Sequence, residues 1–192
     1  MTDPILINIP VPIITPRLIL RPPQIGDGKI LHAAVLESFE LLSQWMPWAK
    51  ERPTPEQSEI FVRQAAANWI LKKDEEPYLP LFMFDKITND FVGATGYHHY
   101  DWDIPSIETG YWIRTSCMGQ GFMTEAVHAL TQFAFLQLKV KRIVITCDPD
   151  NIRSRKIPER LGYKLESVIK SNRVNAQGEV SDTLVFTRFE PL

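Results

Sequence analysis

A helical pattern enclosed between two β-rich runs constrains the fold of this chain more than any other feature. The β-rich runs cover residues 107–114 and 141–147, and residues 121–138 between them repeat apolar side chains at helical spacing. A strand, a helix and a second strand in this order favour parallel pairing of the two strands. The sequence therefore predicts a parallel pair with a helix packed against it. The apolar face of that helix consists of Met123, Val127, Leu130, Ala134 and Leu138.

The rest of the chain alternates between strand-like and helical patterns. Runs at 79–86 and 91–100 flank a Thr-Asn-Asp turn, which predicts an antiparallel hairpin. A helix is expected from Pro55 onward, because Thr54 can cap it and proline is tolerated at the first helical position. Its expected buried face consists of Ile60, Phe61, Ala65, Trp69 and Ile70. Further strands are expected at 17–21, 163–170 and 182–189, and further helices at 27–39 and 151–161.

These elements together predict an α+β fold that is partly α/β in its middle. We expect a mixed, mostly antiparallel sheet of about seven strands with about four helices on its faces. No Gly/Ser-rich linker and no repeat divides the chain. Residues 15–192 are therefore expected to form one domain, and the proline-broken segment 1–14 an extended N-terminal arm.

The composition is typical of a soluble globular protein and argues against several classes of partner. The 21 basic and 23 acidic residues leave a formal net charge of −2, so no positive field favours nucleic acid. The N-terminal segment is apolar but lacks the features of a signal peptide or a membrane-spanning helix. The two cysteines do not form a disulfide framework or a zinc-type motif. We expect a cytoplasmic protein without nucleic-acid or membrane partners and without a metal.

A pair of glycines, Gly119 and Gly121, precedes the central helix. Glycines before a helix allow the free amides of its first turn to approach a phosphate closely. A nucleotide-triphosphate loop needs a lysine after its last glycine, and Phe122 stands there. A dinucleotide fingerprint needs a third glycine, and Thr124 occupies that position. The pyrophosphate of coenzyme A is the third possibility, and it requires only main-chain amides.

Four segments occur in an order that identifies a family. They are TPRLILRP at 15–22, ETGYWI at 108–113, GQGFMTEAV at 119–127 and DNIRSRKIPERLGYKLES at 150–167. With these segments, nearly the whole chain resembles the GCN5-related N-acetyltransferase (GNAT) superfamily. Within it, the chain is similar to the ribosomal-protein-alanine N-acetyltransferase (RimJ/RimL-like) group. The chain departs from the family pattern at Ser116, where Gln or Arg is usual.

The resemblance implies the GNAT fold, in which the parallel strand pair splays to admit the pantetheine arm of acetyl-CoA. Acetyl-CoA is therefore the expected co-substrate. The resemblance places Ile113 at the thioester oxygen through its main chain, and Asn151 either as a helix cap or at a pantetheine amide. The residues expected to bind the pyrophosphate, mainly through their amides, are Met118, Gly119, Gln120, Gly121, Phe122, Met123 and Thr124.

Acetyl transfer to an amine needs a proton acceptor and a group that faces the departing thiolate. Glu108 matches a recurrent carboxylate of the family and is expected to accept the proton, directly or through water. Ser154 matches the Asn-x-x-Ser motif and is expected to bind the cofactor and to face its sulfur. Pro158 cannot donate to the carbonyl of Ser154, so that carbonyl is expected to lack its helical partner and the helix to bend.

Aromatic residues indicate where the acceptor binds. Trp45 and Trp48 lie in the loop between the first two helices, which borders the acceptor cleft in the family, and His98 ends the predicted hairpin. A metal site formed by His98 and His99 is not expected, because neighbours on a strand point to opposite faces. Cys117 and Cys147 have no recognisable base beside them in sequence, which argues against an acetyl-cysteine intermediate.

The sequence thus predicts a transferase that acetylates a primary amine by direct attack in a ternary complex. The favoured acceptor is the α-amine of a protein or peptide N-terminus. Acetylation of a small-molecule amine, such as an antibiotic, a polyamine or an aminoacyl nucleotide, remains an alternative, as does a non-catalytic CoA-binding sensor. A monomer and a homodimer both remain open.

Overall fold

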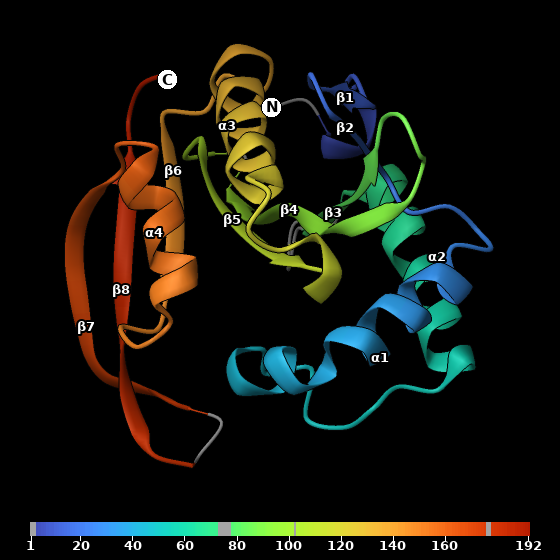
Figure 1. The fold of residues 1–192 in the computed structure, drawn as a ribbon. Coiled ribbons are helices and arrows are strands. Elements are labelled where there is room, and N and C mark those ends of the chain that lie inside the picture. The colour runs from blue at the N-terminus through green and yellow to red at the C-terminus, as the bar shows by residue number, and fades with distance from the viewer. Residues whose placement is uncertain (1–2, 73–77, 102, 176–177) are drawn as a thin grey trace.

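The computed structural model describes residues 3–72, 78–101, 103–175 and 178–192. Along the chain they form η1 (Pro4–Leu6), β1 (Ile13–Ile14), β2 (Leu18–Arg21), α1 (Gly28–Trp45), α2 (Pro55–Leu71), β3 (Tyr78–Asp85), β4 (Phe91–Asp101), β5 (Ser106–Ile113), η2 (Thr115–Cys117), α3 (Phe122–Leu136), β6 (Arg142–Cys147), α4 (Ile152–Arg160), β7 (Lys164–Val174) and β8 (Val180–Arg188). Figure 1 shows these elements along the coloured ribbon. No helix among the described residues is long and apolar enough to cross a membrane.

The strands form one mixed sheet in the order β1-β2-β3-β4-β5-β6-β8-β7. Within the described residues, β5 and β6 pair in parallel and the other neighbours pair antiparallel. This arrangement confirms the predicted fold class. The sheet has one strand more than expected, because Ile13–Ile14 of the proposed arm pairs with β2.

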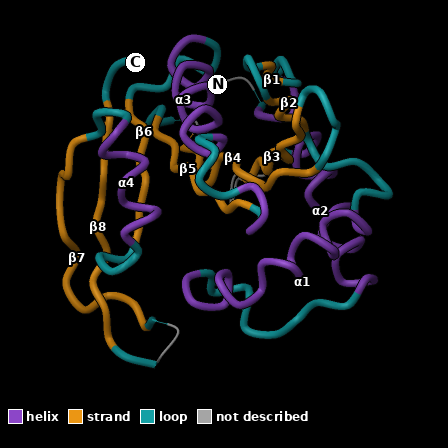
Figure 2. The backbone as a smooth tube through the Cα atoms, in the orientation of Figure 1, coloured by secondary structure: helices purple, strands orange, loops and turns teal. Residues whose placement is uncertain are grey.

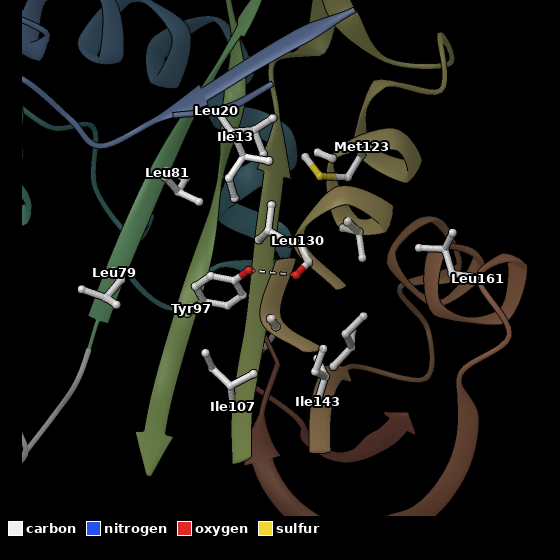
Figure 3. Packing of buried hydrophobic residues seen from close by; sticks show 14 of the residues in the cluster. Ile13, Leu20, Leu79, Leu81, Tyr97, Ile107, Met123, Leu130, Ile143 and Leu161 are labelled. Carbon is white, nitrogen blue, oxygen red and sulfur yellow. Dashed lines mark hydrogen bonds between the residues drawn. The ribbon is translucent and has the colours of Figure 1, made fainter. Parts of the chain in front are cut away.

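Helices cover both faces of the sheet. Leu130 of α3 packs in one buried cluster with Ile107 of β5, whereas Leu31 of α1 belongs to a second cluster with Ala94 of β4. Figure 3 shows α3 side chains facing the strands, with the Tyr97 hydroxyl donating to the Leu130 carbonyl at 2.8 Å. Figure 2 shows α1 and α2 lying away from α3 and α4, with strands between the two pairs. The sheet is therefore the middle layer of the molecule.

Most helices follow the predicted pattern, but α2 turns a different face to the core. Val62 and Trp69 are buried, whereas Ile60 and Ile70, which were expected to be buried, are 47% and 67% exposed. The Trp69 indole donates its N–H to the Pro80 carbonyl at 2.7 Å, which fixes the rotation of the helix against β3. The buried face therefore also includes the small Ser58, and two isoleucines remain outside it.

The parallel pair parts soon after it forms. Its register contains only Ser106↔Arg142, Ile107↔Ile143 and Glu108↔Val144, although β5 continues to Ile113 and β6 to Cys147. Beyond Glu108, β5 follows β4 and β6 follows β8. We call the opening between the two strands beyond Glu108 the notch, and it positions the site described below.

The N-terminus of α2 offers a test of the local folding rules. Thr54 Oγ1 accepts from the Gln57 amide at 3.1 Å, and Gln57 Oε1 accepts from the Thr54 amide at 2.7 Å. Thr54→Ala removes one half of this reciprocal cap and should lower the free energy of unfolding by about 1 kcal/mol. Urea denaturation measures the change. Thr54→Ser keeps the acceptor and should leave stability nearly unchanged, and equal losses in both variants would contradict the capping role.

Candidate active site

A cavity of about 690 Å³ crosses the sheet at the notch. Leu31 and Trp45 of α1 line it on one side of the sheet, and Asn151 and Ser154 line it on the other side. Glu108 also lines it, at the point where β5 and β6 part. The cavity therefore joins a compartment beside α1 to the N-terminus of α4.

Glu108 is held at this junction by two side chains. Its Oε1 atom accepts from the Thr146 hydroxyl at 2.7 Å, and its Oε2 atom lies 3.1 Å from His99 Nδ1. The Glu108 side chain remains 26% exposed. Because Thr146 belongs to β6, the carboxylate is anchored from both strands of the parallel pair and keeps one edge open to the cavity.

The two adjacent histidines correct an expectation. His99 has a left-handed φ of 47°, and the β4–β5 register shifts between His98 and Asp101. This bulge turns both rings toward the cavity, with their centroids 6.4 Å apart, so they do not point to opposite faces as predicted. Within the described residues, no group of three or more His, Cys, Asp or Glu side chains could hold a metal ion.

His98 is an uncharged part of the cavity wall at neutral pH. Burial lowers the pKa of His98 from 6.5 to about 4, against the opposing effect of the nearby Glu108 charge. Its ring stacks on Tyr78 with a centroid distance of 4.5 Å. A Cβ atom at position 110 would lie 3.0 Å from His98 Nε2, so Gly110 provides the room for the ring.

The tryptophans predicted for the acceptor region lie in the compartment beside α1. Trp45 and Trp48 both line the cavity, together with Trp112 of β5, which sequence reasoning did not select. The centroids of the Trp48 and Trp112 rings are 6.2 Å apart. Alternation along β5 places Trp112 on the same face as Glu108, and this spacing was a usable signal.

Ser154 lies on the opposite side of the notch, one turn into α4. Asn151 caps this helix, since its Oδ1 atom accepts from the Ser154 amide at 3.1 Å. Pro158 leaves the Ser154 carbonyl without a helical donor, as predicted, and the Tyr111 hydroxyl of β5 donates to that carbonyl at 3.0 Å. Tyr111 also accepts from Ser154 Oγ at 3.4 Å. Sequence reasoning missed Tyr111, although the vacant carbonyl beside Pro158 indicated that a donor was needed.

The glycine loop before α3 presents unpaired amides. Gly119 and Gly121 have left-handed φ values of 76° and 80°, and in the part of the chain that the structure describes no side chain caps the N-terminus of α3. Among the described residues, none accepts a hydrogen bond from the amides of Gly119, Gln120 or Gly121. The side chains of Phe122 and Met123 are buried, so these residues can reach a ligand only through their main chain.

Side chains from other elements hold this loop in place. Arg17 donates to the Gln120 carbonyl at 2.9 Å and to Glu125 Oε2 at 2.6 Å. On the other side, Glu37 of α1 accepts from Arg114 Nε at 2.6 Å and from the Ser116 amide at 3.0 Å. Ser116 therefore contributes its amide to the loop structure. The loop is fixed by carboxylates and a guanidinium, and its own amides stay available.

The structure brings the predicted residues together in two groups. Glu108, Asn151, Ser154, Trp45, Trp48 and His98 line one cavity. Ile113 and residues 118–124 do not line it; the latter form the loop and the first turn of α3. Arg160 of α4 donates to Thr124 Oγ1 at 3.2 Å, which connects that first turn to the helix that carries Ser154. A sheet that opens at its parallel pair beside such a loop has the architecture of a coenzyme A-dependent acyltransferase.

Comparison with known proteins identifies the family. A family model described as an acetyltransferase (GNAT) domain matches residues 17–164, so the chain belongs to the GNAT acetyltransferase family. The ribosomal-protein-serine acetyltransferase of Escherichia coli (strain K12) is 27% identical over 154 residues, which cover 77% of this chain and 85% of that protein. The putative ribosomal N-acetyltransferase YdaF of Bacillus subtilis (strain 168) is 24% identical over 143 residues, covering 71% of this chain and 72% of that protein.

Two solved structures share the fold. One is RimL, the ribosomal L7/L12 α-N-protein acetyltransferase, in complex with coenzyme A, with a TM-score of 0.81, 24% identity and coverage of 94% of this chain and 97% of that chain. The other is the microcin C7 self-immunity acetyltransferase MccE in complex with acetyl-CoA and AMP, with a TM-score of 0.81, 22% identity and coverage of 92% and 94%. Family and fold together make this protein an acetyl-CoA-dependent N-acetyltransferase of the GNAT type.

Glu125 supplies a pH test of how the loop is held. Burial raises the pKa of Glu125, but hydrogen bonds from Thr15 and Arg17 outweigh this and lower it below its ordinary value of 4.5. A lowered pKa stabilises the fold above the unfolded-state pKa, and this stabilisation is lost as pH falls. Glu125→Gln should therefore lower the free energy of unfolding by about 1 kcal/mol at neutral pH. The difference in the free energy of unfolding between Glu125→Gln and the wild type should shrink below pH about 4, because Glu125 is then protonated in the unfolded state and increasingly in the folded state.

Denaturation curves measured across this pH range provide the check. Glu190→Gln changes an exposed carboxylate near the C-terminus and is the matched control. A deficit of Glu125→Gln that stays constant with pH would show that the carboxylate charge does not hold the loop.

Proposed function

We propose that the protein acetylates the α-amine of a protein or peptide N-terminus by direct attack on acetyl-CoA. The observation that carries this proposal is the single cavity that crosses the notch. It gives the acceptor compartment, bounded by Trp45 and Trp48, direct access to Glu108 and Ser154. Both substrates can then meet without a covalent enzyme intermediate. Burial raises the pKa of the Cys147 thiol to about 11, which keeps this cavity-lining cysteine un-ionised and argues against its use as a nucleophile.

The chemistry of the acceptor supports an α-amine. With a pKa of about 7.7 to 8.0, an α-amine is about a quarter neutral near pH about 7.4, whereas a lysine amine with a pKa of about 10.4 is about one part in a thousand neutral. An N-terminal amine therefore needs little help to lose its proton. One carboxylate suffices, and Glu108 is partly exposed at the junction of the cavity. The names of the relatives from Escherichia coli and Bacillus subtilis also favour ribosomal-protein substrates.

The residues around the notch fit acetyl-CoA. Met118, which the sequence assigned to the pyrophosphate, already donates its amide to the Thr115 carbonyl at 3.2 Å. The amides of residues 119–124, in the glycine loop and the first turn of α3, therefore bind the pyrophosphate. Beyond Glu108, none of the strands that the structure describes pairs with β5 on the notch side, so its main chain through Ile113 can pair with the peptide-like pantetheine arm. Asn151 lies at the same opening. When bound, acetyl-CoA supplies the thioester that the amine attacks.

The catalytic roles follow from position. Glu108 accepts the proton of the acceptor amine, directly or through water. The neutral amine nitrogen then attacks the thioester carbon and the bond from that carbon to sulfur breaks. The proton that the nitrogen loses as the amide forms passes to the departing thiolate, which leaves as the CoA thiol. Ser154 faces the departing sulfur from the α4 side of the notch, and its hydroxyl proton, which rests on the Tyr111 oxygen, turns to the sulfur as negative charge develops there. His98 stays neutral and contributes to the wall beside Glu108.

A small-molecule amine is the second candidate acceptor. The aromatic wall formed by Trp45, Trp48 and Trp112 would suit an amine attached to a flat ring system. The solved structure of MccE contains AMP in addition to acetyl-CoA. A non-catalytic CoA-binding protein is the third possibility, and the assay described next distinguishes all three.

Release of free thiol from acetyl-CoA tests the acceptor class. Peptides that begin with Ala or Ser and have a free N-terminus should support turnover. The same peptides with a blocked N-terminus and an internal lysine should not, because the lysine amine is protonated at neutral pH. Turnover with polyamines or aminoacyl nucleotides alone would favour the second candidate. Thermal stabilisation by CoA without turnover of any amine would favour the third.

Glu108→Gln tests the proton acceptor. An amide cannot take up the proton, so kcat/KM should fall about 100-fold near neutral pH. The ratio of wild-type to Glu108→Gln kcat/KM should fall as pH rises toward the pKa of the acceptor amine, because more of the amine is then already neutral. Glu51→Gln changes another carboxylate that lines the cavity and is the matched control. A pH-independent deficit would assign Glu108 a structural role instead.

A further inference from the structure

Tyr111 forms a bridge across the notch that neither the sequence nor the family match identified. Its hydroxyl donates to the Ser154 carbonyl and accepts from the Ser154 hydroxyl. Resting on the proposed function, we propose that Tyr111 is a positioning residue that directs the Ser154 hydroxyl into the notch, toward the sulfur that leaves. Pro158 makes this possible by leaving the Ser154 carbonyl open to Tyr111.

The hydrogen-bond donors and acceptors of Tyr111 and Ser154 explain why both contacts form. A helical residue at 158 would normally donate its amide to the carbonyl of residue 154, but proline has no amide hydrogen. The single proton of the Tyr111 hydroxyl goes to that carbonyl at 3.0 Å. The lone pairs of the Tyr111 oxygen are then left to accept from Ser154 Oγ at 3.4 Å. One tyrosine hydroxyl thus contacts both polar oxygens of Ser154.

Burial keeps Tyr111 in the form that this arrangement needs. It raises the pKa of Tyr111 well above its ordinary value of 10.0, partly offset by the hydrogen bond from Ser154. The phenol therefore stays protonated across the working pH range and always has a proton for the Ser154 carbonyl. The direction of the two hydrogen bonds does not change with pH.

Ser154 has an alternative partner that would withdraw it from the notch. A serine in the first turn of a helix can donate its hydroxyl to the carbonyl three residues earlier, here that of the N-cap Asn151, which begins the helical ladder of α4. Such a bond lies along the helix axis, away from the strands. The oxygen of Tyr111 competes with this carbonyl for the serine proton. Without the tyrosine hydroxyl, we expect Ser154 to turn back onto its own helix.

Tyr111 lies on the part of β5 that no longer pairs with β6, and its side chain can therefore contact α4. The last paired residues of the parallel strands are Glu108 and Val144, and Tyr111 lies further along β5, where no residue of β6 pairs with it. Its contact with α4 spans the opening where the pantetheine arm is proposed to enter. Tyr111 and Ser154 both line the cavity, so the hydrogen bonds between them form part of its wall.

Tyr111→Phe, Ser154→Ala and the double variant form the test, with steady-state thiol release as the measurement. Tyr111→Phe should lower kcat about tenfold, with KM for acetyl-CoA changed less than about twofold, because a tenfold change corresponds to one modest hydrogen bond. The double variant should be no slower than Ser154→Ala, since Tyr111 acts through Ser154. Tyr97→Phe is the matched control: Tyr97 also donates to a main-chain carbonyl, that of Leu130, but it does not line the cavity.

The proposal would be overturned if Tyr111→Phe lowered kcat by the same factor in the wild type and in the Ser154→Ala background. It would also be overturned if the kcat of Tyr111→Phe equalled that of Tyr97→Phe, or if Ser154→Ala left kcat unchanged. Crystals of Tyr111→Phe give a second measurement that does not need an acceptor. Ser154 Oγ should turn toward the Asn151 carbonyl, and retention of its present rotamer would equally overturn the proposal. If the wild type acetylated no amine, the proposed function would fail, and this rotamer would still decide the role of Tyr111.

Discussion

The separation of β5 from β6 after the pair Glu108↔Val144 is the constraint on which the site depends. It is a stable feature, because each strand is held on its outer side. Antiparallel pairing ties β5 to β4 as far as Ile113, and β6 to β8 as far as Cys147. Neither strand can move to close the opening without breaking those ladders. The sheet thus keeps a permanent passage between its two faces, with Glu108 at the narrow end.

The position of the glycine loop also depends on contacts from outside the loop. Its position is set by carboxylates outside it: Glu37 holds Arg114 and the Ser116 amide, and Glu125 holds Arg17. Because these side chains fix the loop, the amides near Gly119 and Gly121 need no hydrogen-bond acceptor within the loop. Glu37 belongs to α1, which also lines the compartment proposed to bind the acceptor. A shift of α1 would therefore act on both halves of the site, which suits an enzyme that must bring two substrates together.

Features with local causes could be predicted from the sequence, and features set by distant contacts could not. The parallel pair, the hairpin and the Thr54 cap follow from periodicity and from nearby turn and capping residues. The bulge at His99 was missed because a left-handed histidine carries no glycine signal. The exposed Ile60 was assigned to the core because spacing alone does not distinguish between adjacent helix faces. The contact of Tyr111 with Ser154 joins residues 43 positions apart and required the fold.

Pro158 illustrates how a locally unfavourable residue becomes consistent with the fold as a whole. A proline inside a helix costs about 3 kcal/mol, partly because one carbonyl loses its donor. Here the carbonyl of Ser154 regains a donor from Tyr111, so this acceptor is satisfied. The replacement donor comes from the opposite side of the notch instead of from the same helix. The hydrogen bond that a regular helix would use internally therefore connects α4 to β5, and the residue that carries the freed carbonyl also carries the hydroxyl proposed to face the sulfur.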